Sequence, residues 1–218
     1  MGNKTKVKIC GITSLKDAVS AVFAGADALG FVFYRKSPRY ISPRRARVII
    51  RLLPKRVLKV GVFVNAREEI VKRIARYCCL DILQFHGDES AEFCAKFRRY
   101  KIIKAFRLKE RLDLGRVFAY NTFAYLFDNF SRLKPGGTGK AFDWKILKEA
   151  GRMRRPVFLS AGLNAHNVSK AIAMIRPEWV DASSSLEISP GRKDYQKISM
   201  FIRRVKGPRT IYRQGKIA

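Results

Sequence analysis

Acidic residues are scarce in this chain: 17 aspartates and glutamates stand against 46 lysines and arginines in 218 residues. The formal net charge of +29 excludes the combined lysine and glutamate enrichment of hyperthermophilic proteins. The basic residues do not form one tract interleaved with aromatics. They are scattered, often as pairs, at Lys55-Arg56, Arg98-Arg99, Arg154-Arg155 and Arg203-Arg204. This scatter favours a solvated basic surface with weak polyanion binding over a dedicated nucleic-acid partner.

The sequence also lacks the patterns of secreted, membrane-bound and metal-stabilised proteins. Its four cysteines, Cys10, Cys78, Cys79 and Cys94, have neither zinc-type pairing nor the spacing of a disulfide framework. No stretch reaches the ~18 uninterrupted apolar residues of a membrane span, and no signal-peptide core precedes the first apolar run. We therefore expect a cytoplasmic protein with reduced cysteines, no membrane partner and no bound metal.

Short apolar, β-rich runs alternate with longer amphipathic runs along the whole chain. Hydrophobic residues make up 47% of the sequence, which is enough for a large core. Runs such as 59–64 are continuously apolar after the first residue, as is typical of strands covered on both faces in a parallel sheet. Eight strands are expected, at residues 7–10, 28–33, 58–64, 82–85, 102–106, 125–128, 157–160 and 179–182.

Helical patterns fill the intervals, at residues 14–23, 43–53, 67–78, 89–97, 110–120, 144–150, 167–175 and 195–205. Ser14 and Ser42 are predicted N-caps, and Asn65 and Asp88 are further candidates. Eight strands alternating with eight helices in about 200 residues predict an α/β protein with a single (β/α)8 TIM barrel. We expect the barrel to cover residues 1–206 and a basic tail to follow at 207–218.

The most informative motif is Lys8-Ile-Cys-Gly-Ile-Thr13, which closes the first expected strand. A cysteine at the end of a buried strand projects its sulfur over the end of the sheet, where α/β proteins carry out chemistry. A free cysteine is also commonly a small apolar core residue. Taken alone, Cys10 therefore leaves catalysis and packing open.

Other reactive side chains follow the expected strands at the same end of the barrel, where catalytic groups lie in this fold. Together they offer a thiol, a carboxylate and a guanidinium beside small residues of the kind that surround a phosphate. The set comprises Cys10, Arg39, His86, Asp128, Gly162, Asp181 and Ser183 to Ser185. Asp128 follows core residues directly, and an acid there is unfavourable unless it is solvated or paired.

Eight short motifs in order, between about residues 6 and 206, resemble phosphoribosylanthranilate isomerase. They are Lys8–Thr13, Gly30–Tyr34 with Lys36–Ser42, Val60–Asn65, Leu83–Asp88, Gly136–Lys140 with Phe142–Trp144, and Pro190–Asp194. The resemblance implies an enzyme of tryptophan biosynthesis. It would convert N-(5-phosphoribosyl)anthranilate to 1-(2-carboxyphenylamino)-1-deoxyribulose 5-phosphate by an Amadori rearrangement. The substrate is a small phosphosugar, and no cofactor is implied.

The family's functional residues fall on matching positions of this chain. The resemblance implies that Cys10 is the general base at the sugar C2′, that Asp128 is the general acid at the ring oxygen, and that Arg39 faces the anthranilate carboxylate. Loops after the seventh and eighth strands would bind the phosphate through backbone N–H groups. The residues expected there are Ala161, Gly162, Ser184 and Ser185, and Ala161 and one of the serines stand where the family more often has glycine.

Lys8, His86 and Asp181 are further substrate-binding candidates. Lys8 precedes Cys10 by two residues and should lie on the same side of the strand, where its positive charge would favour the thiolate. A thiolate is required, because a thiol with its ordinary pKa is a poor base.

Two alternative functions remain open from sequence. A related phosphosugar isomerase of histidine biosynthesis shares the barrel and the phosphate site but typically uses two aspartates, and Cys10 argues against it. The other alternative is a polyanion- or RNA-binding barrel protein in which catalysis is secondary. Turnover at micromolar substrate would exclude it.

Overall fold

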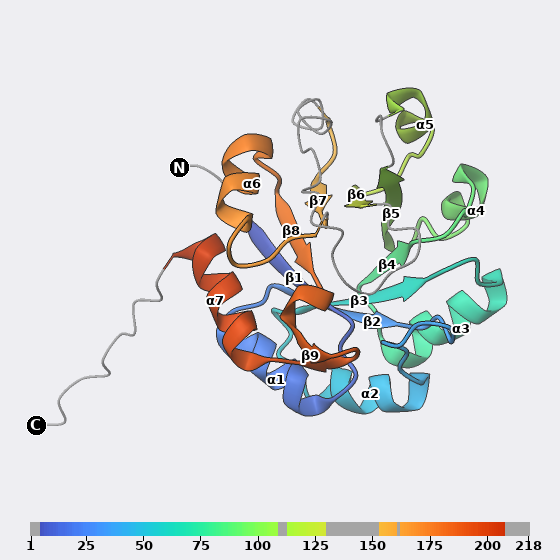
Figure 1. The fold of residues 1–218 in the computed structure, drawn as a ribbon. Coiled ribbons are helices and arrows are strands. Elements are labelled where there is room, and N and C mark those ends of the chain that lie inside the picture. Colours follow the sequence, from blue (N-terminus) through green and yellow to red (C-terminus); the bar gives the residue numbers. More distant parts are fainter. Residues whose placement is uncertain (1–4, 109–112, 130–152, 161, 208–218) are drawn as a thin grey trace, which may run out of the picture.

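A computed structural model of the chain describes residues 5–108, 113–129, 153–160 and 162–207. Its eight parallel strands form a closed barrel, which confirms the predicted fold (Figure 1). Strand β1 (Lys6–Cys10) closes the barrel against β8 (Trp179–Ala182). Between them, in chain order, lie β2 (Ala28–Val32), β3 (Leu58–Phe63), β4 (Ile82–Phe85), β5 (Lys101–Leu108), β6 (Ala124–Asn129) and β7 (Val157–Leu159).

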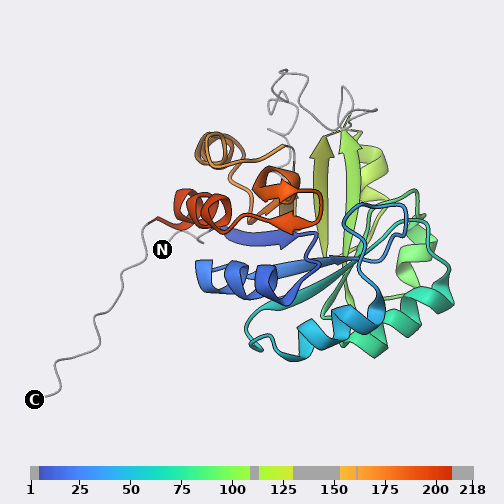
Figure 2. The ribbon, with the colours of Figure 1, turned by 60° about the horizontal axis from the view of Figure 1, so that its bottom comes forward.

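Helices cover the outside of the barrel. They are α1 (Leu15–Ala24), α2 (Pro43–Arg51), α3 (Glu68–Cys78), α4 (Ala91–Ala95), α5 (Leu114–Phe118), α6 (Val168–Ile175) and α7 (Tyr195–Lys206). The last helix returns to pack against α1, so the two ends of the barrel domain lie side by side (Figure 2). The helix expected at 144–150 and the tail expected beyond Gly207 lie outside the described residues.

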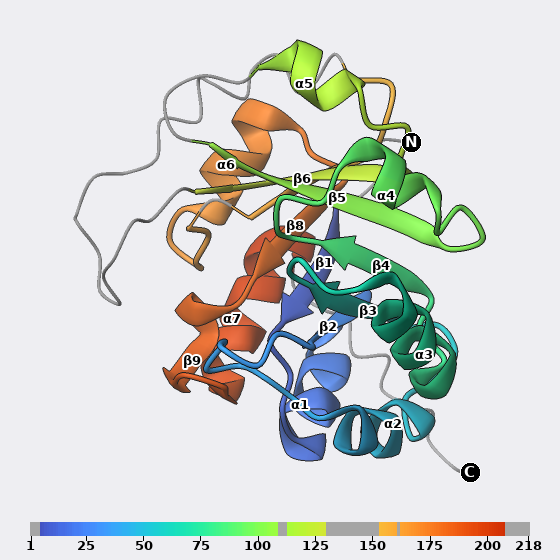
Figure 3. The same cartoon turned by 90° about the vertical axis from the view of Figure 1, so that its right-hand side faces the viewer.

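One segment between β8 and α7 departs from the predicted pattern. A short 3-10 helix, η2 (Ser184–Leu186), leads into an antiparallel pair of strands, β9 (Glu187–Ser189) and β10 (Arg192–Lys193). Figure 3 shows β9 beside the loop that follows β2. This hairpin brings residues of the eighth barrel unit next to those of the first and second units.

Side-chain caps fix where several helices begin. Ser14 and Ser42 each accept a hydrogen bond from the backbone N–H three residues later, as predicted. The other two cap predictions are wrong, because α3 has no side-chain cap and Ser90, not Asp88, caps α4. Asn65 instead has a left-handed φ of 49°, and its side chain accepts the N–H of Asp88. It therefore joins two loops at the C-terminal end of the barrel.

The side chains inside the barrel form two layers of different character. Nearer the N-terminal end lies an apolar layer of Ala28, Val60, Ile82, Ile103, Ala105, Ala124, Leu126, Phe158 and Trp179. Toward the C-terminal end the interior becomes polar, with Lys8, Gln84 and Asp181 all buried. Outward-facing strand residues pack beneath the helices in a second core. The barrel therefore carries its polar interior groups at the end where the sequence places the reactive residues.

Three acidic residues fix the strand register at the opposite, N-terminal end. Each lies just before a strand and accepts, at 2.7–2.8 Å, the backbone N–H of a residue at the start of the adjacent strand: Asp27 from Val7, Asp81 from Lys59 and Glu178 from Val157. Exposed basic pairs share this face, at 55–56, 98–99 and 154–155, immediately before β3, β5 and β7. The N-terminal face of the barrel therefore carries exposed basic side chains. No helix in the described part of the chain is long and apolar enough to cross a membrane.

A buried ion pair stabilises the loop after β4. The Nζ atom of Lys104 lies 2.8 Å from Oε2 of Glu89, and the two side chains are 3% and 2% exposed. Glu89 also accepts the backbone N–H groups of Asn65 and Gly87, and Lys104 donates to the carbonyl of Gly87. Two backbone N–H groups and one ammonium group therefore converge on a single carboxylate in the loop that follows His86.

We expect Glu89→Ala to lower the free energy of unfolding by about 3–5 kcal/mol, because it leaves the Lys104 ammonium buried without its partner. The double variant Glu89→Leu/Lys104→Met should recover a large part of that loss, since no unpaired charge remains. Urea unfolding followed by circular dichroism measures both. A single variant within 1 kcal/mol of the wild type would contradict this account.

Candidate active site

Two glycines make room for the thiol and the guanidinium at the end of β1. Cys10 is 8% exposed, and a Cβ atom on Gly30 of the adjacent strand would lie 2.6 Å from its sulfur. Gly11 has a φ of 79°, and a Cβ atom there would lie 2.7 Å from Cδ of Arg39. Side chains at these two positions would therefore displace the two groups expected to contact substrate.

A buried ion pair lies directly beneath Cys10. Nζ of Lys8 is 2.8 Å from Oδ1 of Asp181, and Ser160 donates to the other carboxylate oxygen at 3.2 Å. Lys8 is fully buried, on the same side of β1 as Cys10. The structure thus brings together three residues predicted for the site, with Lys8 and Asp181 supporting the thiol from within the barrel.

Burial raises the pKa of the Cys10 thiol above its ordinary value, although Lys8 and Lys193 act in the opposite direction. The expectation that Lys8 favours the thiolate is therefore right in sign, but burial outweighs its effect. Lys8 itself keeps its charge: burial lowers its pKa, but the negative charge of Asp181 and the hydrogen bond to that carboxylate oppose burial, and the pKa is raised. In the free protein Cys10 is mainly a neutral thiol near pH 7.

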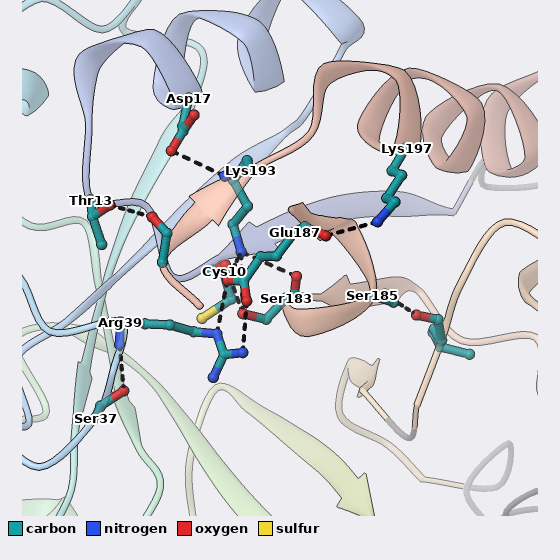
Figure 4. A network of polar contacts seen from close by, with 12 residues as sticks. Cys10, Thr13, Asp17, Ser37, Arg39, Ser183, Ser185, Glu187, Lys193 and Lys197 are labelled. Atoms are coloured by element: carbon teal, nitrogen blue, oxygen red, sulfur yellow. Dashed lines mark hydrogen bonds and ion pairs between the residues drawn. The ribbon is translucent and has the colours of Figure 1, made fainter. Parts of the chain in front are cut away.

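A carboxylate that was not predicted from the sequence, that of Glu187, pairs with both Arg39 and Lys193 (Figure 4). Glu187, the first residue of β9, accepts from Nε and Nη2 of Arg39 at 2.9 and 2.7 Å. It also accepts from Nζ of Lys193 at 2.8 Å. Burial raises the pKa of Glu187, but its bonds to Arg39 and Lys193 outweigh burial and lower it, so Glu187 is anionic.

The pairing with Glu187 leaves part of Arg39 available. A guanidinium presents five N–H groups, and Glu187 occupies only the edge formed by Nε and Nη2. The Nη1 end remains for a second anion, and the side chain is 23% exposed. Arg39 is thus held in place by one carboxylate while it can bind another.

Lys193 is, with Lys8, one of the two cations that lower the pKa of the Cys10 thiol. Its Nζ also contacts the carbonyl and hydroxyl oxygens of Ser183, whose own hydroxyl donates to the Cys10 carbonyl. Burial lowers the pKa of Lys193, and Glu187 only partly offsets this. The sequence did contain a signal for this residue, since Lys193 belongs to the Pro190–Asp194 motif.

The carboxylate of Asp128 lies across the barrel end from these residues, next to His86. His86 Nε2 is 3.4 Å from Asp128 Oδ2, and the side chains are 19% and 31% exposed. Arg107 pairs with Asp128 in the strand register and donates to the backbone carbonyl of His86. The structure therefore brings these two predicted residues together in partly open surroundings.

The two loops predicted to bind phosphate meet through a side-chain hydrogen bond. The hydroxyl of Ser185 donates to the carbonyl of Leu163, so it neither crowds nor directly serves the expected anion site. Gly162 is exposed with a φ of 63°, and Ser184 is exposed in η2. Ala161 lies outside the described residues. Within the described residues, no group of three or more histidine, cysteine or acidic side chains could hold a metal ion.

Replacing Lys193 by methionine should slow alkylation of Cys10 by iodoacetamide at pH 7.5. The variant removes one of two cations that lower the thiol pKa, so the pKa rises and the thiolate fraction falls. Mass spectrometry of the Cys10 peptide measures the rate, and exposed Cys79 in the same sample is the control. A plot of the Cys10 alkylation rate against pH should move to higher pH in the variant. A plot displaced to lower pH would refute the conclusion that Lys193 lowers the pKa of the thiol.

Comparisons with known proteins agree with this geometry. A model of the family described as N-(5′-phosphoribosyl)anthranilate (PRA) isomerase matches residues 7–204. The N-(5′-phosphoribosyl)anthranilate isomerase of Citrifermentans bemidjiense is 50% identical over 202 residues, which are 93% of this chain and 97% of the relative. That of Trichlorobacter lovleyi is 48% identical over 201 residues, covering 92% and 98%.

Solved structures give the same result. The phosphoribosyl anthranilate isomerase of Thermotoga maritima superposes with a TM-score of 0.88 at 46% identity, covering 94% of this chain and 100% of that one. A phosphoribosyl anthranilate isomerase in complex with reduced 1-(o-carboxyphenylamino)-1-deoxyribulose 5-phosphate has a TM-score of 0.85 at 44% identity, with the same coverage. The chain therefore belongs to the N-(5′-phosphoribosyl)anthranilate isomerase family.

Proposed function

We propose that this protein converts N-(5′-phosphoribosyl)anthranilate to 1-(2-carboxyphenylamino)-1-deoxyribulose 5-phosphate in tryptophan biosynthesis. The observation that carries the proposal is the meeting of Cys10, Arg39 and Asp128 at one end of a barrel that belongs to this family. A related structure binds a reduced form of the product. We also propose a cytoplasmic location and a barrel domain that extends to about residue 206.

The reaction needs an acid and a base on one sugar, and we assign these roles to Asp128 and Cys10. Asp128 gives a proton to the furanose ring oxygen while the nitrogen lone pair breaks the C1′–O bond and forms an iminium. Cys10, as thiolate, takes the C2′ proton, and the electron pair of that C–H bond neutralises the iminium to an enolamine. Tautomerisation then protonates C1′ and leaves the C2′ ketone. Each proton transfer contributes roughly 10²–10⁴-fold to the rate.

The charges around Cys10 suit a substrate with two anionic groups. Arg39 and Lys193 carry two positive charges against one on Glu187, so the region keeps a positive excess. We assign the free end of Arg39 to the anthranilate carboxylate. Backbone N–H groups of the two loops that contain Gly162 and Ser184 are assigned to the phosphate, together with Ala161 and Ser185. His86 would face the substrate beside Asp128.

The alternative functions have less support. An enzyme of the histidine pathway would need an aspartate where this chain has Cys10. Here the absence of a side chain at Gly30 leaves room for the Cys10 sulfur. A polyanion-binding barrel without catalysis would have no use for a thiol, an acid and an arginine gathered at one barrel end. We propose that the basic N-terminal face, defined by the pairs at 55–56, 98–99 and 154–155, contributes solubility and helix-dipole stabilisation, with weak polyanion binding as a consequence.

Cys10→Ser and Asp128→Asn should each reduce kcat by two or more orders of magnitude, because each removes one proton-transfer group. The decay of anthranilate fluorescence with freshly generated substrate measures turnover. Arg39→Ala is the contrasting variant, and it should mainly raise KM because carboxylate binding is largely the same in ground and transition states. A folded Cys10→Ser or Asp128→Asn variant with near-normal kcat would disprove the assignment.

Neutralising the three basic pairs of the N-terminal face with glutamine should leave turnover at saturating substrate unchanged, because this face is opposite the active site. The same variant should lose retention on heparin at moderate salt. Loss of turnover in a protein that still folds would show that the basic face takes part in the mechanism.

A further inference from the structure

The side chain of Gln84 is buried and polar, and the site described above gives it no role. Gln84 of β4 is 1% exposed, and its Oε1 atom is the one buried side-chain oxygen or nitrogen of the described residues without a hydrogen-bond partner. Side chains alternate along a strand, so Gln84 points into the barrel on the same side as Ile82 and His86. Ile82 belongs to the apolar layer, and His86 follows the end of the strand. A buried amide oxygen without a partner lowers stability, and a methionine of similar length would avoid that loss.

The other end of the amide explains why a glutamine is present. Nε2 of Gln84 is 2.9 Å from Nδ1 of His86, and the opposite ring nitrogen, Nε2, faces Asp128 at 3.4 Å. A neutral imidazole has one N–H and one acceptor nitrogen. If the amide N–H donates to Nδ1, the ring proton must be on Nε2 and must point toward the Asp128 carboxyl group.

The opposite amide orientation is less favourable for two reasons. It would leave both N–H donors of the buried NH2 group unused, whereas the present orientation leaves one N–H and the oxygen unused. Orphaned buried N–H groups are rarer than under-satisfied carbonyls. It would also fix the ring proton on Nδ1, so that a lone pair on Nε2 faces the carboxylate. The main chain is held separately, by Arg107 donating to the His86 carbonyl.

We propose that Gln84 is a positioning residue of the isomerase, which acts through the His86 ring to present an N–H group to Asp128. The proposal rests on the proposed role of Asp128 as the general acid. When the Asp128 O–H bond breaks and the proton moves to the ring oxygen, a carboxylate forms. The His86 Nε2–H then stabilises that new negative charge as a pre-oriented donor. The wrong tautomer would place a lone pair against it.

Gln84→Met is the direct test, because it keeps the side-chain length and removes both polar atoms. We expect kcat to fall by about 10- to 100-fold with KM within twofold of the wild type, since the interaction strengthens only as charge develops on Asp128. The melting temperature should stay the same or rise, because the unpartnered oxygen is gone. Ile82→Met, a change of similar size in the same interior strand, is the matched control and should leave kcat unchanged.

The tautomer itself can be read without turnover. The chain contains two histidines, so ring ¹⁵N labelling gives two sets of signals, and exposed His166 is the internal reference. We expect His86 of the wild type to carry its proton on Nε2 and to become a mixture of tautomers in Gln84→Met. His166 should not change.

Three results would overturn the proposal. One is a wild-type His86 with its proton on Nδ1. The second is a Gln84→Met variant with unchanged kcat. The third is a variant that loses stability while kcat and KM change together, as expected of a packing residue. Failure of the proposed function is distinguishable from these, because a wild-type protein without isomerase activity would remove the catalytic role of Gln84 even if the Nε2 tautomer were observed.

Discussion

The ion pair between Lys8 and Asp181 is the interaction on which the rest of the site depends. The two residues are partners in the register that joins β1 to β8, so the pair lies where the barrel closes. Charges this deeply buried are stable only when paired and hydrogen-bonded, which restricts how the two strands can align. The same pair lies beneath Cys10, where Lys8 lowers the pKa of the thiol and Asp181 raises it.

Cys10 is consequently subject to two opposing effects. Exclusion of water favours the neutral thiol, whereas Lys8 and Lys193 favour the thiolate. Glu187 moderates this balance, because it binds Arg39 and Lys193 together and keeps both from acting as free charges. An anionic substrate that takes up the free end of Arg39 would bind into a preformed arrangement rather than build one, which limits the ordering cost of binding.

The sequence predicted the barrel and most of the residues at its reactive end because both follow from local rules. Apolar runs indicate parallel strands, and a reactive side chain at the end of a strand, such as Asp128, must lie at the C-terminal end of the barrel. Residues whose role comes from tertiary contacts were not predictable in this way. Glu187 matters because a short hairpin folds back over the loop carrying Arg39, and the position of Asn65 reflects a contact between two loops. Gln84 was detectable by alternation with His86, but only the structure shows that half of its amide is unused.

The scarcity of acidic residues has a structural interpretation. Many acids of the described residues have a defined partner that the fold requires. Some accept strand N–H groups at the N-terminal face, such as Asp27, and others, such as Glu89 and Asp181, neutralise buried lysines. Asp113 and Asp194 cap helices. Acids are therefore retained largely where a backbone donor or an ammonium group needs them, while basic residues crowd the exposed surface. The net charge of +29 thus describes the solvent-facing surface rather than the surroundings of Cys10, where three cations face two carboxylates and the excess is a single positive charge.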